Sequence, residues 1–179
     1  MSASLASAGE TGDAVVMATH PSDPGASAST VRRATADDAD AIARLLHDFN
    51  VEFEAPTPDP PALAQRVRQL LAGGDTEVLL AGPGPDGLAV LRLRASIWTA
   101  GNECYLAELY VVPQRRNSGL GRALMLAAMD LARTRGADYM DLGTSEDDHG
   151  ARALYEKLGF TNREGGPDGP VMLYYEREL

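Results

Sequence analysis

The spacing of apolar residues predicts two helices near the start of the ordered chain. A short strand at Val31 to Ala34 precedes Thr35, whose hydroxyl can accept a hydrogen bond from the first turn of a helix. The segment after it carries apolar residues at helical spacing: Ile42, Leu45, Leu46 and Phe49. A proline-rich break, Pro56 to Pro61, separates this helix from a second amphipathic one that stops at Gly73 and Gly74.

The remaining apolar segments predict a sheet that is completed by two further helices. Three stretches joined by Gly-rich turns are typical of an antiparallel meander, with strands at Thr76 to Ala81, Leu88 to Trp98 and Cys104 to Val112. After them we expect a helix from about Leu120 to Arg135, a strand at Tyr139 to Gly143, a helix from about Gly150 to Leu158 and a last strand at Val171 to Arg177. The sequence therefore predicts an α/β fold with a mixed, mostly antiparallel sheet and about four helices.

Composition places these elements in one domain. A chain of 179 residues, 44% of them hydrophobic, is long enough for one well-buried core. Residues 1–30, rich in Ser, Ala, Gly, Thr and Pro, are predicted to be a disordered tail, which leaves 31–179 as the domain. The single cysteine, Cys104, and three scattered histidines argue against disulfides and a metal site.

Charge and hydropathy limit the partners and the compartment. A formal net charge of −10 repels phosphodiester backbones, so nucleic acid is not an expected partner. No stretch approaches the apolar length of a membrane span, and the first basic residue is Arg32, unlike the start of a signal peptide. We therefore expect a cytoplasmic protein that does not bind a membrane.

The segment Leu109 to Leu124 (LYVVPQRRNSGLGRAL) leads a strand into a glycine-containing turn and then a helix. Backbone N–H groups at a helix start have no partner within the helix, so they can surround a phosphate, and Gly119 and Gly121 permit close approach. Helix starts also use glycine for packing, so this pair alone is weak support. The only lysine is Lys157, which excludes a P-loop, and the G-x-G-x-x-G match at Gly82 to Gly87 joins two strands, unlike a dinucleotide-binding turn.

The same segment resembles the coenzyme A pyrophosphate loop of the GNAT superfamily of N-acetyltransferases, whose signature is [R/Q]-x-x-G-x-[G/A]. Here it is Arg116-Asn-Ser-Gly-Leu-Gly121. A second stretch, Ala151 to Phe160 (ARALYEKLGF), is similar to that family's N-x-x-A-x-x-L-Y-x-x-x-G-F helix and turn. The resemblance covers roughly Val31 to Leu179. It departs at Asn117, where glycine is usual but Asn tolerates a left-handed turn, and at Asp148, where we expect a helix cap instead of the common Asn.

The resemblance implies acetyl-CoA as co-substrate, direct transfer without an acyl-enzyme, and a sheet splayed around the coenzyme. A backbone N–H near Val111 would bond the thioester oxygen, and the amides of Ser118 to Arg122 would hold the pyrophosphate. The residues expected to bind the coenzyme are Leu109, Tyr110, Val111, Val112, Arg116, Asn117, Ser118, Gly119, Leu120, Gly121 and Arg122. No metal is expected. Dimers are common in the family, and no residue pattern in this chain predicts one.

Two side chains are the catalytic candidates. Tyr155 falls where the family places the hydroxyl that hydrogen-bonds the coenzyme sulfur, although an aromatic on that helix face can equally belong to the core. Glu108 interrupts the apolar run Tyr105 to Val112, where a carboxylate must be paired, exposed in a cleft or used. It is either the base that removes the amine proton through water or a paired structural carboxylate.

The acceptor stays open at the level of sequence: an amine of a small molecule, cationic ones included, or of a peptide. Glu52 and Glu54, between the first two helices, either attract a cationic substrate or are simply solvated. The alternative function is a catalytically inactive coenzyme A-binding sensor or partner-binding module with the same fold. A donor other than acetyl, such as succinyl or propionyl, is a further alternative.

Overall fold

A computed structural model of the chain describes residues 30–177. The predicted disordered tail lies outside that range, apart from Thr30. Within it, α-helices and strands follow the expected order as far as the last helix: β1 Val31–Arg33, α1 Ala39–Glu52, α2 Pro60–Gly73, β2 Thr76–Ala81, β3 Gly87–Ala95, β4 Asn102–Val111, α3 Leu120–Thr134, β5 Ala137–Leu142 and α4 His149–Lys157. Short 3-10 turns, η1 Ala36–Asp38 and η2 Pro113–Arg115, precede α1 and follow β4.

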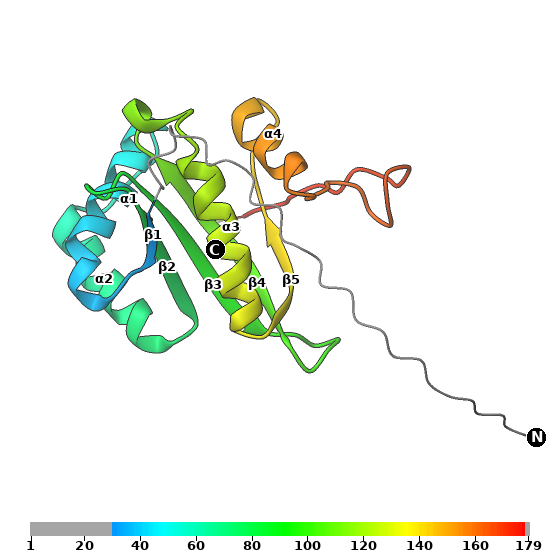
Figure 1. The fold of residues 1–179 in the computed structure, drawn as a ribbon, viewed down its shortest axis with the longest axis horizontal. Helices are drawn as coiled ribbons and strands as arrows, with labels where there is room; N and C mark the ends of the chain where they lie inside the picture. The colour runs from blue at the N-terminus through cyan, green and yellow to red at the C-terminus, as the bar shows by residue number, and fades with distance from the viewer. Residues whose placement is uncertain (1–29, 178–179) are drawn as a thin grey trace, which may run out of the picture.

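The strands form one sheet in the order β1-β2-β3-β4-β5 (Figure 1). The first four are antiparallel neighbours, and β5 joins parallel to β4, so the predicted mixed, mostly antiparallel sheet is confirmed. The parallel step is possible because α3 crosses over the sheet between β4 and β5. No helix within residues 30–177 is long and apolar enough to cross a bilayer.

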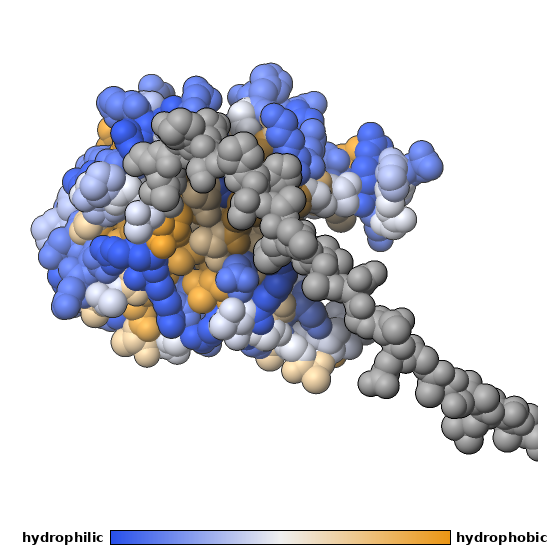
Figure 2. All heavy atoms as spheres, in the orientation of Figure 1, coloured by the Kyte–Doolittle hydropathy of each residue, from blue (hydrophilic) through white to orange (hydrophobic). Residues whose placement is uncertain are grey.

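Two apolar cores lie on opposite faces of this sheet, because side chains alternate along each strand. On one face α3 covers the strands with Leu120, Leu124 and Met125. On the other, α1 packs Ile42 and Leu45 and α2 packs Val67 onto the strands. Figure 2 shows that the outer surfaces of α1 and α2, at the left of the view, are mostly hydrophilic, as amphipathic helices require.

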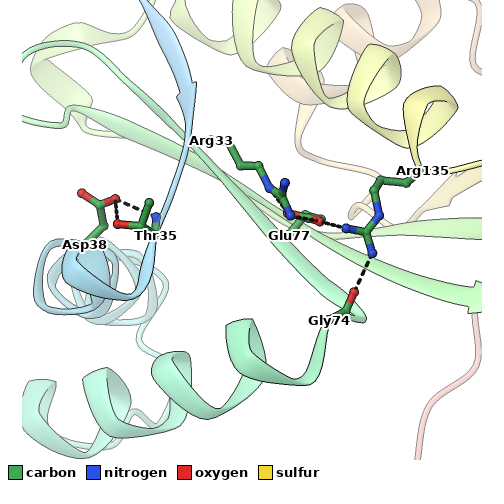
Figure 3. Close-up of polar contacts among 6 residues, drawn as sticks. All are labelled: Arg33, Thr35, Asp38, Gly74, Glu77 and Arg135. Atoms are coloured by element: carbon green, nitrogen blue, oxygen red, sulfur yellow. Dashed lines mark hydrogen bonds and ion pairs between the residues drawn. The ribbon is translucent and has the colours of Figure 1, made fainter.

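A buried carboxylate ties the sheet to its connections. Glu77 in β2 is 2% exposed and accepts hydrogen bonds from Arg33 of β1 and from Arg135, just after α3, each at 2.5 Å. Arg135 also donates to the carbonyl of Gly74 at 2.8 Å. Figure 3 shows Glu77 between the two guanidinium groups. Glu77 and Arg135 together thus join the edge strand β1, the end of α2 and the end of α3.

The structure corrects two predicted strands. The strand expected to run to Trp98 ends at Ala95, and the chain turns there, with Ser96 N–H donating to the carbonyl of Gly101. The last strand expected at Val171 to Arg177 is wrong, because only Val171 forms an isolated bridge, with Arg163. The residues after Val171 have no strand partner within residues 30–177, and β propensity without a partner does not make a strand.

Candidate active site

The sheet opens along one edge of β4. The parallel pairing of β4 with β5 stops at Leu106 and Leu142, whereas β4 continues to Val111 beside β3. Val112 N–H points to that β3 side, where it donates to the carbonyl of Asp86 at 2.9 Å. Because N–H groups alternate along a strand, those of Leu109 and Val111 point to the open side. The divergence that the family resemblance implied is therefore present, with free backbone donors along it.

The opening leads directly into a turn with two left-handed residues. Asn117 has a φ of 60° and Gly119 a φ of 86°, so the expectation that Asn117 would accept the left-handed conformation is confirmed. The first helical hydrogen bond of α3 runs from Ala123 N–H to the carbonyl of Gly119 at 2.9 Å. Within residues 30–177, the backbone N–H groups from Asn117 to Arg122 have no acceptor. They form a row of donors at the positive end of a helix dipole.

This row of donors fits the pyrophosphate of acetyl-CoA. Glycine is needed at Gly119 by its φ, but at Gly121 an added Cβ would meet only Leu154 at 3.6 Å, an ordinary contact. Packing therefore does not explain Gly121, and a glycine there leaves room for a ligand to approach the backbone. The exposed Arg122 has no ionic partner among the residues that the structure describes. The residues from Ser118 to Arg122 would hold the diphosphate through backbone donors and this cation.

Glu108 lies on β4 beside this opening, opposite Val90 of β3. Its side chain is half-buried, and burial raises the pKa of its carboxyl above the usual value. No hydrogen bond or ion pair joins it to another residue within 30–177, so the structure offers no partner for the paired structural alternative. A half-buried carboxylate with a raised pKa and no partner is suited to accept a proton.

Tyr155, in α4, lies on the α3 side of the sheet. It is buried in the α3-side core and packs edge-on against Phe160 at 6.1 Å between ring centroids. Burial, followed by the nearby Asp148 carboxylate, raises the pKa of its phenol to about 12. The hydroxyl has no hydrogen-bond partner within the described range, yet it is not sealed from solvent. Tyr155 therefore contributes to the core and also keeps an unused donor.

The departures from the family pattern take structural roles. Asp148 caps α4, because its Oδ1 accepts a hydrogen bond from Ala151 N–H at 3.0 Å, as predicted.

Cys104 is completely buried, and burial raises the pKa of its thiol to about 11, which disfavours the nucleophilic thiolate. Leu109 and Val111 pack on the α3 side, whereas Tyr110 faces α1 and stacks edge-on with Phe49 at 5.6 Å.

Sequence reasoning missed one ionic contact at the site. Arg116 pairs with Glu52 at the end of α1, with Nη1 at 2.7 Å from Oε1 and Nη2 at 2.8 Å from Oε2. This interaction holds the pKa of the Glu52 carboxyl below its usual value. Glu52 is therefore neither freely solvated nor an unpaired attractor for a cationic substrate. The two residues are 64 positions apart, so no local pattern signals the pair.

The comparisons with known proteins agree with this geometry. Residues 42–160 match the model of the Acetyltransferase (GNAT) family. An aminoglycoside N(6')-acetyltransferase type 1 of Stenotrophomonas maltophilia is 32% identical over 78% of this chain and 90% of its own length. A mycothiol acetyltransferase of Thermobispora bispora is 34% identical over 72% of this chain, but the match spans only 40% of that protein.

The solved structures show the same fold. A crystal structure of a provisionally assigned acetyltransferase from Arthrobacter sp. FB24 is 50% identical, with a TM-score of 0.79, and covers 88% of this chain and 100% of its own. The open edge of β4, the donor row before α3 and these matches lead to one assignment. The chain belongs to the GNAT family of acetyltransferases.

Proposed function

We propose that the protein transfers an acetyl group from acetyl-CoA directly to the amine of a small molecule or a peptide. The observation that carries this proposal is the divergence of β4 from β5 beside the unpaired N–H groups that open α3. That arrangement offers one donor for a thioester oxygen and a row of donors for a diphosphate, in sequence along the chain.

Backbone and side chains divide the chemistry between them. Acetyl-CoA would supply an activated acetyl thioester. Val111 N–H stabilises the charge on the carbonyl oxygen, and Glu108, through water, takes the proton from the acceptor ammonium. A new C–N bond then replaces the C–S bond. A free amine with a pKa near ~10.4 costs about 4.6 kcal/mol at pH 7, so a base beside the acceptor has a clear use.

Tyr155 stabilises the departing thiolate as a neutral hydrogen-bond donor. With its phenol pKa at about 12 and a thiol pKa near ~8.5, complete transfer of the proton would be uphill by about 5 kcal/mol. The phenol therefore keeps its proton while it donates to sulfur, and the thiolate takes a proton from solvent or the proton that the acceptor nitrogen loses as it becomes the amide.

The acceptor proposed is a small amine, a choice supported by the names of the relatives. One relative acts on aminoglycosides, and another is a mycothiol acetyltransferase. The acidic net charge of −10 favours cationic acceptors at long range. The alternative of an inactive sensor is less well supported, because Glu108 has no structural partner among residues 30–177.

A thiol-release assay with an acceptor panel tests the proposal. The panel contains polyamines, aminoglycosides, amino acids and short peptides, each with acetyl-, propionyl- and succinyl-CoA. We expect release with acetyl-CoA on one class of acceptor and an acetylated amine in the product. Thiol release at the same rate with and without an acceptor, or no release with any pair of donor and acceptor, would favour the inactive sensor. Faster release from propionyl- or succinyl-CoA would replace acetyl as the donor group.

A further inference from the structure

Arg116 belongs to the coenzyme loop, but its side chain does not join the loop's row of donors. Each nitrogen of its guanidinium has a protein partner. Nη1 and Nη2 contact the Glu52 carboxylate at 2.7 and 2.8 Å, and Nε donates to the carbonyl of Val111 at 3.0 Å. The guanidinium also lies 5.8 Å from the centre of the Tyr110 ring, in the range of a cation–π contact.

Glu52 needs this partner because of its place on the helix. It is the last residue of α1, where the helix dipole already carries partial negative charge, so an unpaired carboxylate there is unfavourable. The fork of Arg116 meets both oxygens of the carboxylate, through a hydrogen bond from Nη2 and an ionic contact from Nη1, a geometry that lysine cannot supply. Both side chains are partly exposed, at 41% for Arg116 and 28% for Glu52.

The contacts connect three parts of the proposed site. Glu52 fixes the end of α1, Val111 is the residue whose N–H would bind the thioester oxygen, and Arg116 directly precedes the left-handed Asn117. One guanidinium therefore sets the position of the pyrophosphate loop relative to the thioester donor. The loop residues from Pro113 to Gly119 are exposed, and the other ion pair that anchors them, Arg115 with Asp86, is longer at 3.5 Å.

We propose that the Glu52–Arg116 ion pair is a clamp that preorganises the coenzyme loop, with Arg116 acting as a positioning residue and not as a phosphate ligand. The inference rests on the proposed use of acetyl-CoA. It assigns to the signature arginine a task that its sequence position does not reveal. Preorganisation raises affinity because the loop is ordered before the coenzyme arrives.

Calorimetric titration with acetyl-CoA tests the clamp. The variants are Glu52→Gln, Arg116→Gln and the double variant, with Glu54→Gln as the matched control. Glu54 is an exposed carboxylate two residues away with no ionic partner among residues 30–177. We expect each single variant to bind about fivefold more weakly, near the upper limit for a partly exposed pair. The double variant should bind no more weakly than either single one, and the control should bind as the wild type does.

Glu52→Gln separates the clamp from a direct phosphate contact. If Arg116 bound phosphate, removal of a competing carboxylate would free it and strengthen binding of acetyl-CoA. The clamp predicts the opposite sign, together with a raised KM for acetyl-CoA and an unchanged KM for the acceptor. Arg116→Lys, a milder change, should fall between wild type and Arg116→Gln, because it keeps the charge without the fork.

The outcomes distinguish this inference from the proposed function. If the wild type does not bind acetyl-CoA, the proposed function fails. If the wild type binds and Glu52→Gln binds equally well or more tightly, only the clamp is overturned. Circular dichroism of each variant confirms that it is folded before its affinity is compared.

Discussion

Glu77 and Glu108 are both carboxylates placed within apolar strands, and the structure treats them differently. Glu77 is paired with Arg33 and Arg135, whereas Glu108 has no partner among the described residues. A buried charge is costly unless it is paired or used. Sequence reasoning singled out only Glu108, and the arginines that pair with Glu77 lie 44 and 58 positions away from it. Only the fold decides which carboxylate is free.

Replacement of Glu108 tests its role as base. We expect Glu108→Gln to lower kcat about 10²-fold, the usual effect of losing a general base. The pKa of Glu108 is raised, so the active carboxylate is lost as pH falls through that raised value. As the pH falls, the wild type should therefore lose activity at a higher pH than it would if Glu108 had the ordinary glutamate pKa near ~4.3. Glu108→Gln should lack this acidic limb.

The pH dependence of kcat/KM measures this difference. Glu103→Gln is the matched control, because Glu103 lies on the same strand and is paired with Arg94. If kcat/KM of Glu108→Gln still fell at acidic pH as it does in the wild type, the proton transfer would belong to another group.

Tyr155→Phe removes the hydroxyl that is proposed to donate a hydrogen bond to the thiolate, and it leaves the ring in the core. We expect kcat to fall about tenfold, with little change in the affinity for acetyl-CoA or in thermal stability, because the hydroxyl has no partner within residues 30–177. Steady-state kinetics and thermal unfolding measure these effects. An unchanged rate would leave Tyr155 with its core role alone.

At the scale of elements, the turn before α3 was predictable and the end of the chain was not. This turn combines local signals, two glycines and an Asn at a helix start, and Asn117 adopts the left-handed conformation that it was expected to tolerate. The segment after Val171 also looked like a strand, but strand formation depends on a partner edge that local sequence does not contain.

Asn117 provides a test of that turn. At a φ of 60° a β-branched residue is strained by about 1–2 kcal/mol, whereas glycine is not. We expect Asn117→Gly to bind acetyl-CoA as the wild type does and Asn117→Val to bind about tenfold more weakly. Calorimetric titration of the two variants gives this comparison. Equal affinity in both would mean that the left-handed conformation is not needed for binding.

At the scale of the whole molecule, the sheet is held by contacts between distant segments. The order of elements and the meander followed from periodicity and turn residues. The opening beyond Leu106 was implied by family resemblance alone, because no residue pattern marks the point where β5 ends. The Glu77 network could have been suspected from a carboxylate inside the strand Thr76–Ala81, by the same argument that identified Glu108.

Removal of the Glu77 charge should destabilise the whole domain. Glu77→Gln leaves Arg33 and Arg135 without their shared anion, at a cost of about 2 kcal/mol, because both guanidinium groups keep some solvent. This corresponds to a fall in Tm of about 4–8 °C for a chain of this size. Differential scanning calorimetry gives the value, with Glu103→Gln, which breaks a more exposed ion pair, as the control. Equal Tm values for the two variants would contradict the network's role.

The central claim is that the opened edge of β4 and the turn before α3 bind acetyl-CoA for transfer to an amine. The most direct measurement is calorimetric titration of the full chain with acetyl-CoA, followed by thiol release in the presence and absence of the best amine acceptor. We predict saturable binding and release that requires the acceptor. Absence of acetyl-CoA binding would contradict the claim.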